Sequence, residues 1–142
     1  MNTHNWDAEQ QHIVALLKSR LGTQASCTEV IDAYEGLMRS IWSFTARLLG
    51  DGGARAVLSR SISVAAREAP LVIRVRTRER DVDLSEFRHY VAEAGCGTTE
   101  VTQALIILGV MIFATLADLA GESITTPLIR HLEALDQESG KR

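Results

Sequence analysis

Apolar residues recur at three- and four-residue steps along most of the chain, the spacing of one face of an α-helix. The pattern predicts helices near residues 6–21, 28–49, 54–69, 84–94, 99–120 and 127–136. Glycines such as Gly22 and Gly121 stand where helices are expected to end, and Ser26 with Glu29 forms a capping box before the second helix. We therefore predict an all-α fold of about six helices in a single domain, 1–142.

One short segment, about 71–81, departs from the helical pattern. Arginines occupy alternate positions from Arg74 to Arg80, and Ile73, Val75 and Thr77 hold the positions between and before the first three, as in an extended chain. A single strand has no sheet to join, so we expect an extended, Arg-rich connector or one edge of a two-stranded ribbon across a dimer. This connector divides the domain into halves at about 5–70 and 82–137, and the tail 137–142 is expected to fray.

The two halves resemble each other in sequence. A shift of 71 residues aligns the segment 28–50 with 99–121 and gives nine identities in 23 positions without a gap. The identities include a shared Thr-Glu-Val start and the glycine, Gly50 or Gly121, at which each long helix is expected to end. We interpret this as an internal duplication of a three-helix unit. It predicts pseudo-two-fold symmetry, with a long apolar second helix in each half.

The long apolar helix of the second half carries no charge from Val101 to Ala117. This run is at the lower limit for a membrane span, about 17 residues, so a buried helix of a soluble domain is the favoured interpretation. The side facing away from the core is unusually apolar, and either the rest of the domain or a second copy of the chain is expected to cover it. The candidates for an oligomer contact, or for ordinary core packing, are Ala104, Ile107, Met111 and Thr115.

Composition disfavours several classes of protein. The chain has 142 residues, of which 46% are hydrophobic and 23% charged, as in a globular domain and unlike a disordered tail. The net charge of -3 disfavours a dedicated nucleic-acid binder. The polar N-terminus has no basic region followed by an apolar run, so we expect no secretory signal and a cytoplasmic location.

Residues with catalytic or metal-binding chemistry are sparse. The four histidines lie in separate predicted elements without HxxxH or HExxH spacing, and the sequence has no CxxC pair. No metal site, cofactor site or catalytic residue is therefore predicted. Cys27 and Cys96 each precede a long helix, where a thiol can become reactive. A redox pair or a nucleophile is one hypothesis for them, and small structural cysteines are the favoured one.

Positive charge is concentrated between residues 39 and 90, which contain ten arginines and no lysine. Arginine binds carboxylate and phosphate groups with two parallel hydrogen bonds. An extended connector would place its arginines on one face, as candidates for contact with an acidic partner or an anionic ligand. These candidates are Arg74, Arg76, Arg78 and Arg80. The alternative is a solvated face whose arginines pair with nearby carboxylates.

These observations favour a non-catalytic function. We expect a cytoplasmic, bacterial-type regulatory or adaptor domain that acts through protein-protein contacts as a homodimer. The alternative is a regulatory protein that holds a small apolar or anionic ligand between its halves, near Trp42, Ile107, Met111 and the Arg-rich connector. A DNA-associated regulator comes third, and an enzyme is least favoured because no catalytic constellation is found. Neither a cofactor nor a membrane span is expected.

Overall fold

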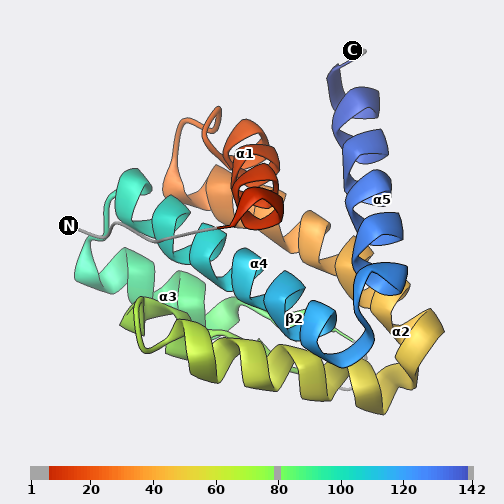
Figure 1. Cartoon of the computed structure of the whole chain (residues 1–142). Helices are drawn as coiled ribbons and strands as arrows, with labels where there is room; N and C mark the ends of the chain where they lie inside the picture. Colours follow the sequence, from red (N-terminus) through yellow and green to blue (C-terminus); the bar gives the residue numbers. More distant parts are fainter. Residues whose placement is uncertain (1–6, 79–80, 141–142) are drawn as a thin grey trace.

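The chain is all-α, as predicted, in a computed structural model that describes residues 7–78 and 81–140. The α-helices, shown in Figure 1, are α1 (Ala8–Leu21), α2 (Cys27–Ala65), α3 (Ser85–Ala94), α4 (Thr98–Ala120) and α5 (Glu122–Gly140). Between α2 and α3 lie a short 3-10 helix, η1 (Pro70–Arg74), and the strands β1 (Arg76–Thr77) and β2 (Val82–Asp83). The described ranges thus contain five α-helices, and the predicted count of six is not confirmed.

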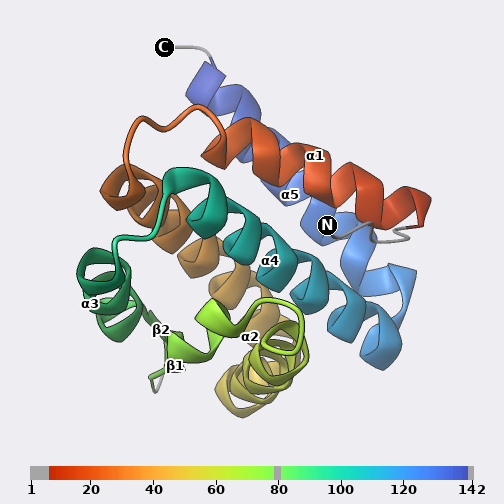
Figure 2. The same ribbon diagram turned by 90° about the vertical axis from the view of Figure 1, so that its left-hand side faces the viewer.

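Helix α4 lies at the centre of the fold. Figures 1 and 2 show α1 and α5 on one side of it, and η1 with the second part of α2 on the other. The middle of α4, from Ala104 to Val110, is buried without interruption. Its own chain therefore covers it on all sides, which is why a helix this apolar fits here. It is the one helix in the described ranges long and apolar enough to cross a membrane, a test that core helices of soluble proteins also pass.

The helix starts follow from capping side chains. Asp7 and Gln10 form a reciprocal capping box at α1, with bonds of 2.8 and 3.1 Å to each other's backbone amides. At α2, the Ser26 hydroxyl accepts from the Glu29 amide at 3.2 Å, as predicted. The Glu29 carboxylate accepts from the amide of Ala25, one residue earlier than in an ideal capping box. These bonds satisfy amides that would otherwise lack partners in the first turn.

Two glycines set the bends that give the fold its shape. Gly50 (φ 78°, ψ 168°) bends α2, and Gly121 (φ 66°, ψ -161°) separates α4 from α5. Both conformations are open almost solely to glycine. Helix α2 resumes directly after Gly50, so the predicted stop there is a bend within one element. Helix α5 begins at Glu122, and Pro127, predicted as its first residue, lies inside it.

The predicted extended connector, about 71–81, is extended only in part. Its first residues belong to the 3-10 helix η1, which Pro70 begins. Strand β1 then pairs antiparallel with β2, Arg76 opposite Asp83 and Thr77 opposite Val82. The two-stranded ribbon therefore lies within one chain and not across a dimer. Because η1 is helical, Arg74 does not share an extended face with Arg76.

A small polar network joins α2 to α4 inside the core. The buried Ser61 hydroxyl lies 2.7 Å from the Val57 carbonyl oxygen and 3.1 Å from the Thr115 hydroxyl. Thr115 in turn donates to the Met111 carbonyl oxygen at 2.8 Å. Buried hydroxyls are tolerated when they are hydrogen-bonded in this way. Thr115, one of the candidates for an oligomer contact, is thus accounted for by packing within the chain.

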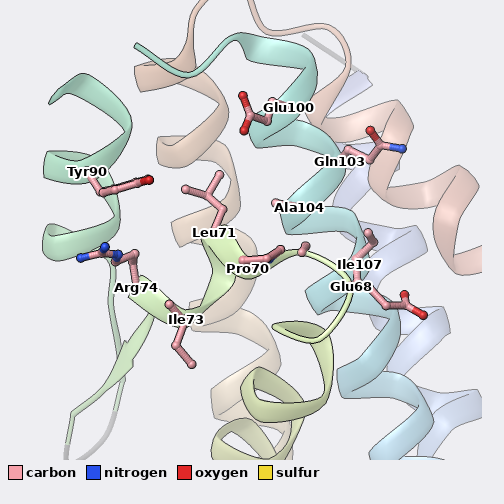
Figure 3. Close-up of a pocket in the computed structure, with 11 residues that line it drawn as sticks. Glu68, Pro70, Leu71, Ile73, Arg74, Tyr90, Glu100, Gln103, Ala104 and Ile107 are labelled. Carbon is pink, nitrogen blue, oxygen red and sulfur yellow. The ribbon is translucent and has the colours of Figure 1, made fainter. Parts of the chain in front are cut away.

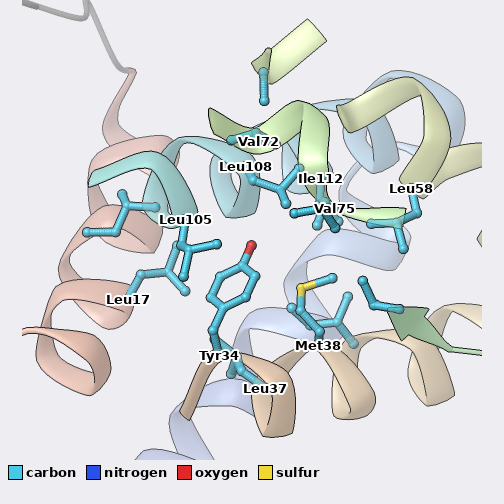
Figure 4. Packing of buried hydrophobic residues seen from close by; sticks show 14 of the residues in the cluster. Leu17, Tyr34, Leu37, Met38, Leu58, Val72, Val75, Leu105, Leu108 and Ile112 are labelled. Atoms are coloured by element: carbon cyan, nitrogen blue, oxygen red, sulfur yellow. The ribbon is translucent and has the colours of Figure 1, made fainter. Parts of the chain in front are cut away.

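Tyr34 is the largest fully buried side chain of the core, with 0% exposure. Figure 4 shows its ring among leucines that include Leu17 and Leu105. Its hydroxyl has no hydrogen-bond partner among the described residues. Burial raises the pKa of Tyr34 far above the ordinary value near 10. The folded chain therefore keeps this proton in a pH range where the unfolded chain releases it.

The variant Tyr34→Phe is expected to reduce the loss of stability in alkali. Above about pH 10, the wild-type free energy of unfolding should fall by up to about 1.4 kcal/mol per pH unit through this group, because the unfolded state binds fewer protons. The variant lacks that titration and should lose less between pH 9 and 11. Urea denaturation of both proteins across this range measures the difference. Equal pH slopes would contradict the assignment.

Candidate functional site

An open cavity of about 500 Å³ lies between η1, α3 and the first half of α4. We call it the η1–α4 cavity; Figure 3 shows its lining. Its lining residues are Glu68, Ala69, Pro70, Leu71, Ile73, Arg74, Tyr90, Glu100, Gln103, Ala104 and Ile107. Residues 68–70 end the first predicted half, residues 71–74 belong to the predicted connector, and residues 90–107 belong to the second half. The cavity is therefore lined by parts of both halves and of the connector between them.

One side of the 3-10 helix η1 forms a wall of the cavity. Val72 and Val75, three residues apart, are buried at 0% and 1% exposure and anchor the segment to the core. Leu71 and Ile73 lie beside them on the cavity side, and Ile73 is 49% exposed. The alternating pattern predicted that Ile73 and Val75 share a face. The 3-10 turn overturns this, because it places residues three apart, not two apart, on one side.

Helix α4 supplies the opposite wall. Glu100, Gln103, Ala104 and Ile107 are spaced three and four residues apart, so they lie on one face of the helix. Ala104 and Ile107 are each 4% exposed and form an apolar floor. Glu100 and Gln103, nearer the start of α4, are exposed at the rim. This wall is therefore apolar inside and polar at its edge.

Arg74 provides the positive charge of the site. Its guanidinium carbon lies 4.3 Å from the centre of the Tyr90 ring, a cation-π contact. One of its nitrogens is 3.8 Å from the Glu86 carboxylate, which also accepts a 2.9 Å hydrogen bond from Arg76. Arg74 is thus held on the α3 side of the cavity. Figure 3 shows Arg74 and Tyr90 on one side of Leu71, and Glu68 and Ile107 on the other.

Arg76 and Arg78 lie outside the cavity and beside carboxylates. Arg76 pairs with Glu86, as described, and Arg78 lies 3.2 Å from Asp83. Hydrogen bonds from the Ser85 hydroxyl and amide, and then Arg78, hold the pKa of Asp83 below its ordinary value. Arg80 lies outside the described residues. The arrangement favours the alternative of arginines paired with nearby carboxylates.

The candidates for an oligomer contact are covered by the chain itself. Ala104 and Ile107 are buried at the floor of the η1–α4 cavity, and Thr115 is 6% exposed in the core. Met111 is partly buried and packs against the core cluster. Packing within the chain is therefore sufficient to explain why this face of α4 is apolar. The cavity brings together Arg74, a candidate for contact with an anion, and Ala104 and Ile107, candidates for an oligomer contact. Nothing in the sequence indicated that the two sets lie in one place.

A second open cavity, of about 660 Å³, lies between the start of α2 and α3. Its lining includes both cysteines together with Arg88 and His89. The Cys27 thiol donates to the Cys96 carbonyl oxygen, with a sulfur-to-oxygen distance of 3.3 Å. We call it the cysteine cavity. The sequence indicated that each thiol precedes a long helix, but not that the Cys27 thiol lies beside the Cys96 backbone.

Two histidines form ion pairs at the surface. His12 lies 2.9 Å from Glu133, and His89 lies 3.3 Å from Glu93. Within residues 7–78 and 81–140, no group of three or more histidine, cysteine, aspartate or glutamate side chains could hold a metal ion. The two open cavities described above are therefore the candidate binding features considered below.

Comparison of the chain with protein-family models, with curated proteins and with solved structures gives no match in any of the three. Function must therefore be argued from the cavities. Among the residues that line the η1–α4 cavity, only Arg74, Ala104 and Ile107 were predicted as site residues. Sequence reasoning missed Glu68, Ala69, Pro70, Leu71, Ile73, Tyr90, Glu100 and Gln103. The helical spacing of residues 100–107 could have grouped the α4 members, but no sequence signal places them against η1.

Proposed function

We propose that this chain is a non-catalytic binding domain that holds a segment of a partner protein in the η1–α4 cavity. The carrying observation is that this cavity joins an apolar floor, Ala104 and Ile107, to a fixed arginine, Arg74. Apolar anchors surrounded by polar residues, with arginine and tyrosine among them, are typical of protein-protein interfaces. A regulatory or adaptor role through protein contacts is consistent with such a site.

The character of the cavity favours a polypeptide over a small molecule. Small-molecule sites usually enclose most of the ligand surface in a largely apolar wall. Here the rim residues Glu68, Ile73, Glu100 and Gln103 are exposed, so much of a bound molecule would remain in contact with solvent. An extended or helical segment can cover such an open surface and place charges at both ends.

The charges define the chemistry of the segment. Arg74 stands on the α3 side, and Glu100 stands on α4. We therefore expect a segment with two or more apolar side chains, a carboxylate that reaches Arg74, and a basic residue near Glu100. Such charge pairing sets orientation and specificity more than affinity.

A displayed library of peptides of about 20 residues, selected on the intact protein, tests this proposal. We expect the selected peptides to share apolar residues and an acidic residue. Ile73→Ser and Arg74→Ala should each weaken their binding by about tenfold or more, because the first removes an exposed apolar side chain that the peptide would cover and the second removes the partner of its carboxylate. Fluorescence anisotropy with a labelled peptide measures the dissociation constants.

Matched variants separate the cavity from general surface effects. Leu119→Ser removes an apolar side chain that is 64% exposed at the far end of α4. Arg78→Ala removes an exposed arginine of the ribbon outside the cavity. Neither should change binding, and circular dichroism should show the same helix content in all four variants. Failure to select any peptide, or equal losses in all four variants, would overturn the proposal.

A small ligand in the same cavity is the second candidate function, since about 500 Å³ is enough volume for one. Ile107 and Arg74 line this cavity, whereas Trp42 and Met111 are not among its lining residues. Native mass spectrometry of the freshly purified protein separates the candidates. An adduct of a few hundred daltons that is lost on denaturation favours the ligand. A bare mass favours the protein segment, and twice the chain mass favours the proposed homodimer.

We also propose that the chain is an internal duplication. Helices α2 and α4 begin at Cys27 and Thr98, which the 71-residue shift aligns. The aligned glycines Gly50 and Gly121 adopt closely similar backbone conformations, and a further helical segment follows each. These observations support two related helix-glycine-helix units, α2 and the pair α4 and α5.

A further inference from the structure

The two cysteines of the chain are 69 residues apart in sequence and adjacent in space. Cys27 is the first residue of α2, and Cys96 lies in the short link between α3 and α4. Both are partly buried, and both line the open cysteine cavity, so small solutes can reach them. This places two thiols at a solvent-accessible junction of the fold.

The Cys27 thiol lies beside the backbone of Cys96. The Cys27 sulfur is 3.3 Å from the carbonyl oxygen of Cys96. Covalent bond lengths then limit the distance between the two Cα atoms to about 8.5 Å, whereas disulfides span about 4.4–6.8 Å. A shift of one or two ångströms at most, with rotation of the Cys96 side chain, is therefore sufficient for bonding.

The link that carries Cys96 has room for this shift. Gly95 and Gly97 flank it, and an added side-chain carbon at either glycine would meet nothing within 4 Å. Gly95 takes a left-handed conformation (φ 66°) that ends α3, and the Cys96 amide donates to the Val91 carbonyl oxygen at 3.2 Å. The link is thus anchored at α3 and unobstructed around its two glycines.

We propose that Cys27 and Cys96 form a reversible intramolecular disulfide under oxidation by a hydroperoxide. With hydrogen peroxide, one thiol attacks the O–O bond, becomes a sulfenic acid and releases water. The other thiol attacks the sulfenic sulfur, the S–S bond forms, and a second water leaves. Each sulfur loses one electron and the peroxide gains two. A dithiol returns the pair to the reduced state.

The surroundings of Cys96 slow the reaction of its thiol with peroxide near neutral pH. Burial, followed by the nearby Glu100 and Cys27, raises the pKa of the Cys96 thiol. Thiolate is the reactive species, so a raised pKa slows reaction near neutral pH. Once formed, the bond ties the start of α2 to the start of α4 and constrains the unfolded chain.

Oxidation of the intact, fully reduced chain with hydrogen peroxide tests the proposal. Iodoacetamide labelling followed by intact mass measurement counts the free thiols. We expect both thiols to disappear together, with a loss of two hydrogen atoms and no change in chain number on a non-reducing gel. The melting temperature should rise by about 10 °C, as for closure of a loop of this length. Dithiothreitol should reverse both changes.

The single variants Cys27→Ser and Cys96→Ser are the matched controls. Each keeps one thiol, so neither can form the internal bond, and neither should gain melting temperature on oxidation. Two outcomes would overturn the proposal: wild-type thiols that react independently, at the rates seen in the single variants, or oxidation that yields only disulfide-linked dimers. Circular dichroism of the reduced variants checks that they fold like the wild type.

Discussion

Replacement of Leu108 by alanine is expected to lower the free energy of unfolding by about 3 kcal/mol, within a range of about 2–5 kcal/mol. Leu108 is fully buried in the middle of α4 and is surrounded by the core shown in Figure 4. The shortened side chain loses its apolar transfer energy and leaves a cavity that close-packed neighbours fill only in part. Urea denaturation followed by circular dichroism measures the change.

Leu119→Ala is the matched control, because it removes the same atoms from the same helix. Leu119 is 64% exposed, so its truncation should change the free energy of unfolding by less than about 0.5 kcal/mol. The contrast tests whether the chain itself buries α4. Similar small effects at both positions would mean that α4 is not packed as the core of this fold. The membrane or intersubunit interpretation of its apolar surface would then regain support.

The helical architecture could be predicted because its signals are local. Capping side chains such as Ser26 act within one turn, and left-handed glycines such as Gly95 end a helix by their own backbone conformation. The bend at Gly50 was predicted as a stop, because glycine permits a non-helical conformation without requiring one. Gly52 and Gly53 follow it in the same cluster and continue the helix.

The candidate binding site could be predicted only in fragments. Arg74 and Ile107 were each identified, one from arginine spacing and the other from an apolar helix face. Their meeting depends on how η1 folds against α4, which is a tertiary contact with no local signal. The proline at the start of η1 and the three-residue spacing of Val72 and Val75 were the available clues. In the same segment, arginine and apolar residues alternate, and this alternation favoured the prediction of an extended chain.

Alanine at either bend glycine is expected to destabilise the fold. Gly50→Ala and Gly121→Ala should each lower the free energy of unfolding by about 1–3 kcal/mol, because an L side chain is strained at those backbone angles. A side-chain carbon at either position would meet nothing within 4 Å, so the penalty is conformational and not a clash. Urea denaturation of each variant measures it.

Gly36→Ala is a control for which the free energy of unfolding is expected to rise and not fall. Gly36 lies inside α2 at an exposed helical position, also with nothing within 4 Å of an added carbon. Alanine there should stabilise the fold by about 0.5–1 kcal/mol, since it favours helix and limits the unfolded chain. Stabilisation by alanine at Gly50 would contradict the bend.

The same measurements test the duplication. Two equivalent joints of a duplicated unit require similar losses of unfolding free energy at Gly50 and Gly121. A loss at one glycine alone would count against the duplication.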